Sequence, residues 1–226
     1  EASEPILARP VRAALLEWLD EIWAADELAA VGLAPRRRAL FSGPPGVGKT
    51  TLAHHLAARL GLPMLAVRAD RLQSSYMSQS AKSLGGLFDQ LADAGPMMVF
   101  FDEFDSIAGT RIGAGGHNPT AANNHNLTVN TLLARLDAFT GFAVAATNAA
   151  ADIDGAVWRR FDIQIALELP GAQEGERILA RYLAPYAVPG GELAVLADAF
   201  AGATPALMRS FAESLKRQLV LGPRLG

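Results

Sequence analysis

The sequence predicts an α/β fold in which a doubly wound, parallel five-stranded sheet is followed by a small helical domain. Short apolar runs alternate with segments of helical spacing, which is typical of strands joined by helices. The five apolar runs lie at residues 39–42, 64–69, 97–102, 142–148 and 163–169. After Pro170-Gly171 no further run of this kind follows. We therefore expect an α/β domain over residues 1–170 and a helical lid that caps it over residues 171–226.

Local patterns justify the individual elements. The second, third and fourth apolar runs are continuous, which predicts strands that helices bury on both faces. In the lid, helices are expected at residues 173–184, 192–201 and 205–221. The last begins at Pro205, where a missing N–H is harmless, and is expected to end at Gly222-Pro223. The stretch 109–126 is polar and irregular, and we expect a surface loop there.

Composition argues against several classes of protein. The chain has 226 residues, half of them hydrophobic, and a formal net charge of -3. It has no long run of Lys or Arg, so it offers no broad electrostatic footprint and nucleic acid is not an expected partner. Cysteine is absent, which excludes disulfides and thiolate metal sites. The apolar runs are far shorter than the roughly 18–20 residues that cross a bilayer, and we expect a cytoplasmic protein without a membrane span.

A glycine-rich loop follows the first apolar run and precedes a helical stretch at 51–60. Its sequence is Gly-Pro-Pro-Gly-Val-Gly-Lys-Thr. A strand, such a loop and a helix N-terminus form a cradle of backbone N–H groups for nucleotide phosphates. Lys49 would bridge the β- and γ-phosphate oxygens, and the Thr50 hydroxyl would ligate Mg²⁺. A guanine-specific Asn-Lys-x-Asp motif is absent, which favours ATP over GTP. The predicted nucleotide contacts here are Gly43, Pro44, Pro45, Gly46, Val47, Gly48, Lys49, Thr50 and Thr51.

Two acids, Asp102 and Glu103, stand at the end of the third apolar run. An acidic pair after a strand is, taken alone, more often a solvated turn than a functional pair. About 50 residues after a phosphate loop, however, it is placed to face a bound Mg-nucleotide. We expect Asp102 to hold Mg²⁺ together with Thr50, and Glu103 to polarise the water that attacks the γ-phosphate.

These two segments, GPPGVGKT and MVFFDEFDSIA, resemble the Walker A and Walker B motifs of the AAA clade of AAA+ ATPases. The likeness runs from about Val31 to the end of the chain. The resemblance implies that Asn148, at the end of the fourth apolar run, is the sensor 1 residue. It also implies that Arg159 and Arg160 are arginine fingers that reach a neighbouring subunit's nucleotide. Hydrolysis would then require a homo-oligomeric ring, typically a hexamer.

The resemblance extends to regions with less specific motifs. Tyr76 and Met77 lie where the family has its first pore loop, which implies a protein client threaded through the ring; the alternative is a pair packed in the core. Asp137 lies in a segment similar to the family's inter-subunit signalling motif, although Ala138 replaces its glycine. In the lid, Gly202 and Ala203 would lie against adenine and ribose. Arg209 is expected to be a surface or interface residue.

The leading hypothesis is therefore an ATP-hydrolysing motor that remodels or unfolds a protein client. A nucleic-acid-remodelling relative is one alternative, but it would need cationic residues where Tyr76 and Met77 stand. A second alternative is an ATP-binding assembly switch with little turnover. The base Glu103 and the arginine pair argue against such a switch, because a pure binding module has no use for them.

Overall fold

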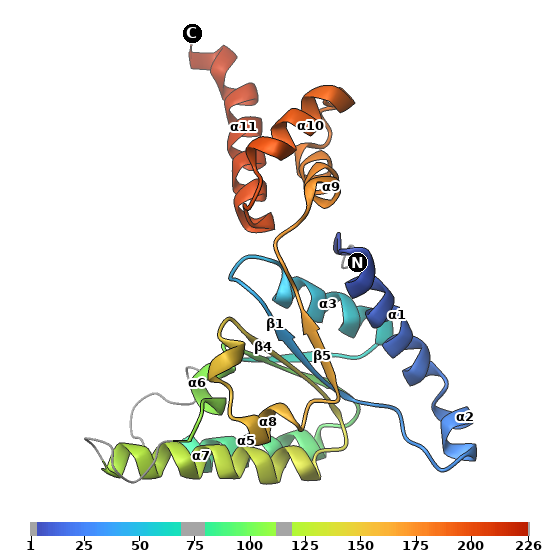
Figure 1. Ribbon diagram of the computed structural model, residues 1–226, viewed down its shortest axis with the longest axis vertical. Helices are drawn as coiled ribbons and strands as arrows, with labels where there is room; N and C mark the ends of the chain where they lie inside the picture. The colour runs from blue at the N-terminus through green and yellow to red at the C-terminus, as the bar shows by residue number, and fades with distance from the viewer. Residues whose placement is uncertain (1–3, 69–79, 112–118, 226) are drawn as a thin grey trace.

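The computed structural model describes residues 4–68, 80–111 and 119–225. Its centre is an all-parallel, five-stranded sheet in the order β2-β3-β4-β1-β5 (Figure 1). The strands are β1 (Arg38–Ser42), β2 (Met64–Arg68), β3 (Met98–Asp102), β4 (Phe142–Thr147) and β5 (Ile163–Ala166). The predicted α/β class and the number of strands are thus confirmed.

Helices precede, connect and follow these strands. Before the sheet come α1 (Arg9–Trp23) and α2 (Ala25–Ala30). Between the strands lie α3 (Lys49–Leu60), α5 (Ser80–Asp93), α6 (Asp105–Ala108), α7 (Pro119–Ala138), the 3-10 turn η1 (Ala150–Asp152) and α8 (Gly155–Trp158). The lid helices are α9 (Ala172–Leu183), α10 (Gly190–Ala199) and α11 (Pro205–Leu225).

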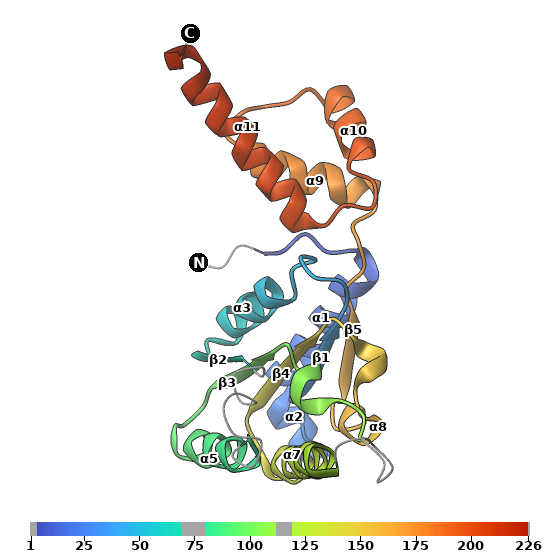
Figure 2. The same cartoon turned by 90° about the vertical axis from the view of Figure 1, so that its left-hand side faces the viewer.

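The two faces of the sheet carry separate hydrophobic cores. Because side chains alternate along a strand, Leu40 enters the core beneath α5 and α7, while its neighbour Phe41 enters the core beneath α1 and α3. Phe101 and Phe100 divide in the same way. Figures 1 and 2 show α5 and α7 side by side on one face and α3 on the other. This double covering keeps the carboxyl ends of the central strands in fixed positions.

The lid has its own core and faces the loop that follows β1. Ile178 and Leu179 of α9 pack with Met208 of α11 in a third cluster of buried residues. One segment leads from β5 into α9, and the three helices lie at the end of the molecule beyond α3 (Figure 1). A cavity between the two parts is lined by residues of both the large domain and the lid.

The prediction of two-sided burial is wrong for the second apolar run. It forms β2, which lies at the edge of the sheet and, among the strands that the structure describes, pairs with β3 alone. Its residues are half-buried or exposed, and Leu65 is 40% exposed. A continuous apolar run thus marks a strand without telling whether that strand is central.

Two predicted boundaries in the second half of the chain are also wrong. The expected loop at 109–126 is helical from Pro119 onward, because α7 buries Val129 and other apolar residues beneath the sheet and packing outweighs low helix propensity. The last helix continues past Gly222-Pro223 to Leu225. A proline this close to a helix end frees few carbonyl groups, and water can bind them there.

Candidate functional site

The predicted phosphate loop runs from the end of β1 to the first turn of α3. Gly48 is the N-cap residue of α3 and has a φ of 104°, a left-handed conformation that favours glycine. Gly43 has a φ of 144° and lies against the chain beyond β5, where a Cβ atom would be 2.1 Å from the carbonyl oxygen of Leu167. These two glycines let the loop close over the helix N-terminus, which is the geometry of an anion cradle.

Lys49 begins α3 and is buried, with 7% of the residue exposed. Its Nζ donates hydrogen bonds to the carbonyl oxygens of Gly43 at 2.6 Å and Pro44 at 2.8 Å. The third donor goes to Oδ1 of Asn148 at 2.7 Å. Burial lowers the pKa of Lys49, and the field of nearby carboxylates opposes this shift. The structure thus brings the loop lysine and the predicted sensor residue together.

Thr50 and Asp102 lie beside each other at the carboxyl edge of the sheet. The Thr50 hydroxyl donates to Oδ2 of Asp102 at 3.4 Å. Hydroxyl and carboxylate oxygens are the ligands that Mg²⁺ prefers, so this pair fits the cation. In the described ranges no group of three or more His, Cys, Asp or Glu side chains could hold a metal ion. A cation here would therefore take its remaining ligands from phosphate and water, as Mg²⁺ commonly does.

Glu103 follows β3 and is exposed. Its φ of 53° is the positive φ of a non-glycine residue, and its N–H donates to Oδ1 of Asp102 at 3.0 Å. Such backbone strain persists where neighbours hold the residue, and it occurs preferentially at functional sites. The Glu103 carboxylate lies 3.4 Å from Nη2 of Arg68, at the end of β2. The base of the sequence prediction therefore stands at the site with an arginine as its partner.

A cavity of about 370 Å³ joins these residues to the lid. The large domain contributes the loop, both acids and Asn148, and the lid contributes a tyrosine, a proline, an alanine and an arginine. Its described lining is Pro45, Gly46, Gly48, Lys49, Thr50, Thr51, Asp102, Glu103, Asn148, Tyr182, Pro205, Ala206 and Arg209. Sequence reasoning missed Tyr182 and left Arg209 without a role. The Arg209 guanidinium lies 6.0 Å from the centre of the Tyr182 ring, on the lid side of the cavity.

A second cavity, of about 450 Å³, lies next to the first and shares Pro205 with it. Its walls are mostly apolar and include Val47 of the loop and Ile178 of the lid. The N-terminal segment 6–11 forms another wall, and the segment that follows β5 forms the last. Sequence reasoning did not assign the N-terminal segment, because it carries no motif beyond a few apolar residues.

Gly202 and Ala203 lie just before α11. Gly202 has a φ of 78°, and Ala203 packs against the lid core. Among the described residues that line the two cavities, Pro205 and Ala206 come from this segment, whereas Gly202 and Ala203 do not. The N–H of Ala206 donates to the carbonyl oxygen of Gly46 at 3.2 Å, so the lid contacts the phosphate loop directly. Contact of Gly202 and Ala203 with a nucleotide stays a prediction.

The predicted arginine fingers directly follow the short helix α8, with Arg159 as its C-cap residue, and the structure distinguishes between them. Arg160 makes a two-pronged ion pair with Asp137 of α7, with Nε and Nη2 at 2.9 and 3.0 Å from the two carboxylate oxygens. This contact with Arg160 lowers the pKa of Asp137. Arg159 is exposed, and its guanidinium has no hydrogen bond or ion pair with any residue that the structure describes. One arginine is therefore anchored in its own chain and the other projects outward.

The segment that carries both arginines is itself anchored by Asp154. This buried N-cap residue of α8 accepts the N–H of Ala156 at 2.8 Å, and its other oxygen accepts Nε of Arg111 at 2.9 Å. Burial alone raises the pKa of Asp154, but the hydrogen bonds from Ala156 and Arg111 outweigh it and the pKa is lowered. The start of the arginine segment is thus fixed to the chain that follows the Walker B strand.

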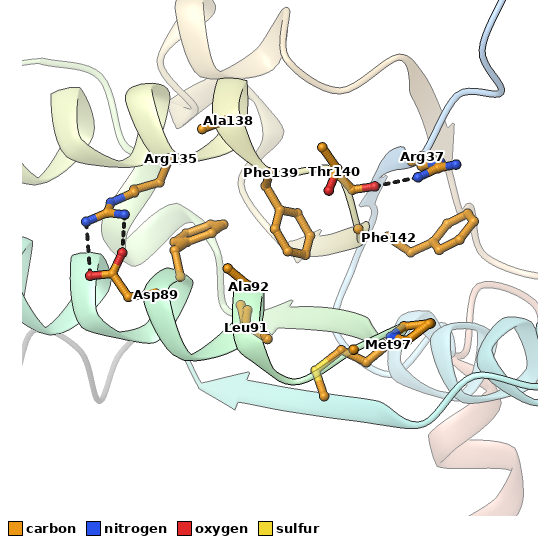
Figure 3. A pocket seen from close by; sticks show the side chains of 14 residues that line it. Arg37, Asp89, Leu91, Ala92, Met97, Arg135, Ala138, Phe139, Thr140 and Phe142 are labelled. Carbon is orange, nitrogen blue, oxygen red and sulfur yellow. Dashed lines mark hydrogen bonds and ion pairs between the residues drawn. The ribbon is translucent and has the colours of Figure 1, made fainter.

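Tyr76 and Met77, the predicted pore-loop pair, lie outside the described residues. A third cavity, of about 410 Å³, lies between the ends of α5 and α7. Figure 3 shows Phe139 and Phe142 beside it, with Arg135 paired to Asp89 and Arg37 donating to the carbonyl oxygen of Thr140. Its polar side chains already have partners within the chain, and we assign it no ligand.

The fold and the first cavity define the class of the protein. A parallel sheet with a glycine-rich loop before α3, a buried loop lysine and an acidic pair on a neighbouring strand belongs to the P-loop nucleotide-binding proteins. Residues 39–169, more than half of the chain, match the family described as "ATPase family associated with various cellular activities (AAA)". The chain belongs to this family, as the sequence prediction held.

Similar proteins include one of Sinorhizobium fredii, described as an uncharacterized AAA family ATPase y4kL, which is 42% identical over 70% of this chain and 47% of its own length. The ATP-dependent zinc metalloprotease FtsH 3 of Sorangium cellulosum is 33% identical over 80% of the chain and 31% of its own length. The peroxisomal ATPase pex6 of Schizosaccharomyces pombe is 33% identical over 70% of the chain and 17% of its own length. The chain thus spans less than half the length of each of these relatives. Among the described helices, none has the length and apolar character to span a membrane.

Proposed function

We propose that this chain binds Mg-ATP in the first cavity and hydrolyses it to ADP and phosphate. One observation carries the proposal: a single cavity gathers Lys49 and Thr50 from the first turn of α3, Asp102 and Glu103 from the end of β3, and Asn148 from the end of β4. Each has a chemical type suited to phosphoryl transfer. The membership of the AAA family supports the same reading.

The chemistry assigned to each side chain follows from its position. Lys49 would turn its ammonium from Asn148 to the β- and γ-phosphate oxygens, while the loop N–H groups bind the β-phosphate. Glu103 would leave Arg68 and accept a proton from a water whose oxygen bonds to the γ-phosphorus, as the bond to the bridging oxygen breaks and ADP leaves. Thr50 and Asp102 would hold Mg²⁺, which supplies a positive charge to the phosphate oxygens.

The second cavity is our candidate binding site for the adenine ring of ATP. It adjoins the phosphate loop at Val47, and its mostly apolar walls would stack on a purine ring while the phosphates occupy the first cavity. Because the N-terminal segment, the chain after β5 and the lid all line this cavity, a bound purine would contact all three. This arrangement supports a lid whose position depends on the nucleotide.

The arrangement of the arginines supports assembly into a homo-oligomeric ring, for which we propose six subunits. Arg159 projects from the surface, whereas Asp137 holds Arg160. We therefore assign Arg159 as the finger that enters the neighbouring subunit's site and Arg160 as its support. A guanidinium supplied in trans to the γ-phosphate can raise the rate by about 10³–10⁵.

We further propose that the motor acts on a protein client that passes Tyr76 and Met77. Two observations support a protein client over a nucleic-acid client. The sequence has a net charge of -3 and no long run of basic residues, and the chain is similar to relatives named as proteases. Stimulation of turnover by an unfolded polypeptide, and its absence with single-stranded DNA, is the expected result. The reverse result would favour the nucleic-acid alternative.

Replacing the base tests the catalytic part of the proposal. Glu103→Gln keeps the shape of the side chain and removes its basicity, so ATP binding is expected to persist while turnover falls at least about 100-fold. Glu192→Gln, on the exposed face of α10, is the matched control and should turn over like the wild type. Equal rates for Glu103→Gln and the wild type would overturn the assignment of the base. Little turnover by the assembled wild type would instead leave the ATP-binding switch as the better description.

A further inference from the structure

A buried hydrogen bond connects the segment that follows Glu103 to the segment that carries Asn148. Thr147 is the last residue of β4 and is completely buried. Its hydroxyl donates to Oδ1 of Asp105 at 2.6 Å, and it accepts the N–H of Ala149 at 3.0 Å. The hydroxyl has a single proton to donate, and it donates this proton in the hydrogen bond to Asp105. Asp105 thus orients the hydroxyl that accepts the N–H of Ala149, on the far side of Asn148.

The same two segments meet a second time through their backbones. The N–H of Phe104 donates to the carbonyl oxygen of Ala146 at 2.9 Å, and the Phe104 side chain is completely buried. Glu103 stands directly before this anchor with its left-handed φ of 53°. The strained base is thus held by Asp102 on one side and by the contacts of Phe104 and Asp105 with β4 on the other.

Nucleotide binding makes the bond to Asp105 more important. In this structure Asn148 is held by Lys49 at 2.7 Å. When the lysine turns to the phosphates, Asn148 loses that partner, and the Thr147 hydroxyl remains as the side-chain tether of its turn. We propose that Asp105 is a positioning residue for hydrolysis: it holds the turn of Asn148 and the turn of Glu103 in one arrangement through the hydroxyl of Thr147. This inference rests on the proposed ATPase function.

Loss of the Asp105 carboxylate should affect the rate of ATP hydrolysis much more than the affinity for ATP. Asp105 is not among the residues that line the first cavity, and its carboxylate acts on Lys49 through its electrostatic field without a direct contact, so its loss should change ATP binding little. A displacement of the base or sensor by about 1 Å can cost about 100-fold in rate. We therefore expect Asp105→Ala to lower kcat by about 10- to 100-fold while the Kd for a non-hydrolysed ATP analogue changes less than about threefold.

Conservative variants distinguish positioning from charge and from folding. Asp105→Asn retains an oxygen that can accept the hydroxyl, and Thr147→Ser retains the hydroxyl, so both should keep kcat within about threefold of the wild type. Thr147→Val removes the hydroxyl at constant shape, and with it both the bond to Asp105 and the bond from Ala149, so it should lower kcat at least as much as Asp105→Ala. Combining Asp105→Ala with Thr147→Val should cost no more than Thr147→Val alone, because that change already removes the bond to Asp105.

The experiment measures kcat, analogue Kd and thermal unfolding for these variants of the full chain. The control is Thr128→Val, which removes another buried hydroxyl that donates to a backbone carbonyl within α7, and its kcat should equal that of the wild type. Unchanged kcat in Asp105→Ala, equal losses in Asp105→Asn and Asp105→Ala, or additive losses in the double variant would each overturn the inference. A wild-type chain without Glu103-dependent turnover would instead overturn the proposed function, and this inference with it.

Discussion

Replacing Gly43 by alanine should distort the phosphate loop where it packs closely against the chain beyond β5. The new Cβ would lie 2.1 Å from the carbonyl oxygen of Leu167, whereas real Cβ atoms essentially never approach another atom within 3.0 Å. The clashing atom belongs to the backbone of Leu167. This backbone cannot easily move aside, because the N–H of Leu167 donates to the carbonyl oxygen of Ser42 at 2.7 Å. The loop and the chain beyond β5 must therefore separate by about 1 Å.

Two costs add in Gly43→Ala. Forcing atoms into a filled space costs about 1–3 kcal/mol, and a φ of 144° adds strain of about 1–3 kcal/mol, so we expect a loss of about 2–6 kcal/mol in the free energy of unfolding. Gly61→Ala is the matched control: its φ is 65°, a Cβ there would meet nothing within 4 Å, and its loss in the free energy of unfolding should be about 1–2 kcal/mol.

Urea unfolding followed by tryptophan fluorescence measures this difference. All three tryptophans, Trp18, Trp23 and Trp158, lie in residues 1–170, so the signal reports on the domain that carries the loop. Turnover of Gly43→Ala should also fall by about 100-fold, since a shift of about 1 Å displaces the phosphate cradle. If Gly43→Ala lost no more stability than Gly61→Ala and kept its turnover, the close approach of loop and strand would be refuted.

Three further predictions follow from the site. Lys49→Met removes two charge-assisted hydrogen bonds to phosphate and should raise the Kd of a fluorescent ATP analogue by about 10²–10⁴-fold; unchanged affinity would contradict the role of the lysine. Arg159→Lys should lower turnover of the assembled protein by at least about 100-fold with unchanged analogue Kd, and retained turnover would remove it as the finger. Asp154 has a lowered pKa, so its contribution to stability is present above the ordinary carboxyl pKa of about 3.8 and is lost as the pH falls below it. The difference in Tm between the wild type and Asp154→Asn should therefore be constant at neutral pH and narrow at low pH, and a constant difference throughout would show that ionisation of Asp154 is irrelevant.

The sequence sufficed for those features that depend on neighbours along the chain. Apolar runs separated by helical segments predict the sheet, because each strand and helix reveals itself locally. The glycine-rich loop and the acidic pair are compact patterns, and they lie in one cavity because parallel strands end at the same edge of a sheet.

Other features depend on contacts that no local pattern reveals. Arg159 and Arg160 are adjacent and chemically identical in the sequence, and only the position of Asp137, 23 residues earlier, distinguishes them. The wall formed by segment 6–11 is equally invisible, because apolar residues near a chain end read as ordinary core. The edge position of β2 likewise follows from strand order, which its own composition does not encode.

A mixing experiment tests the central claim, that neighbouring subunits share each hydrolysis site, most directly. Glu103→Gln chains lack the base but can donate Arg159, whereas Arg159→Ala chains retain the base and cannot donate the finger. Each variant alone should be inactive, and random mixing in equal amounts should form about a quarter of the interfaces with both groups present and restore measurable turnover. A mixture that assembles into common oligomers and stays as inactive as its components would contradict the shared site.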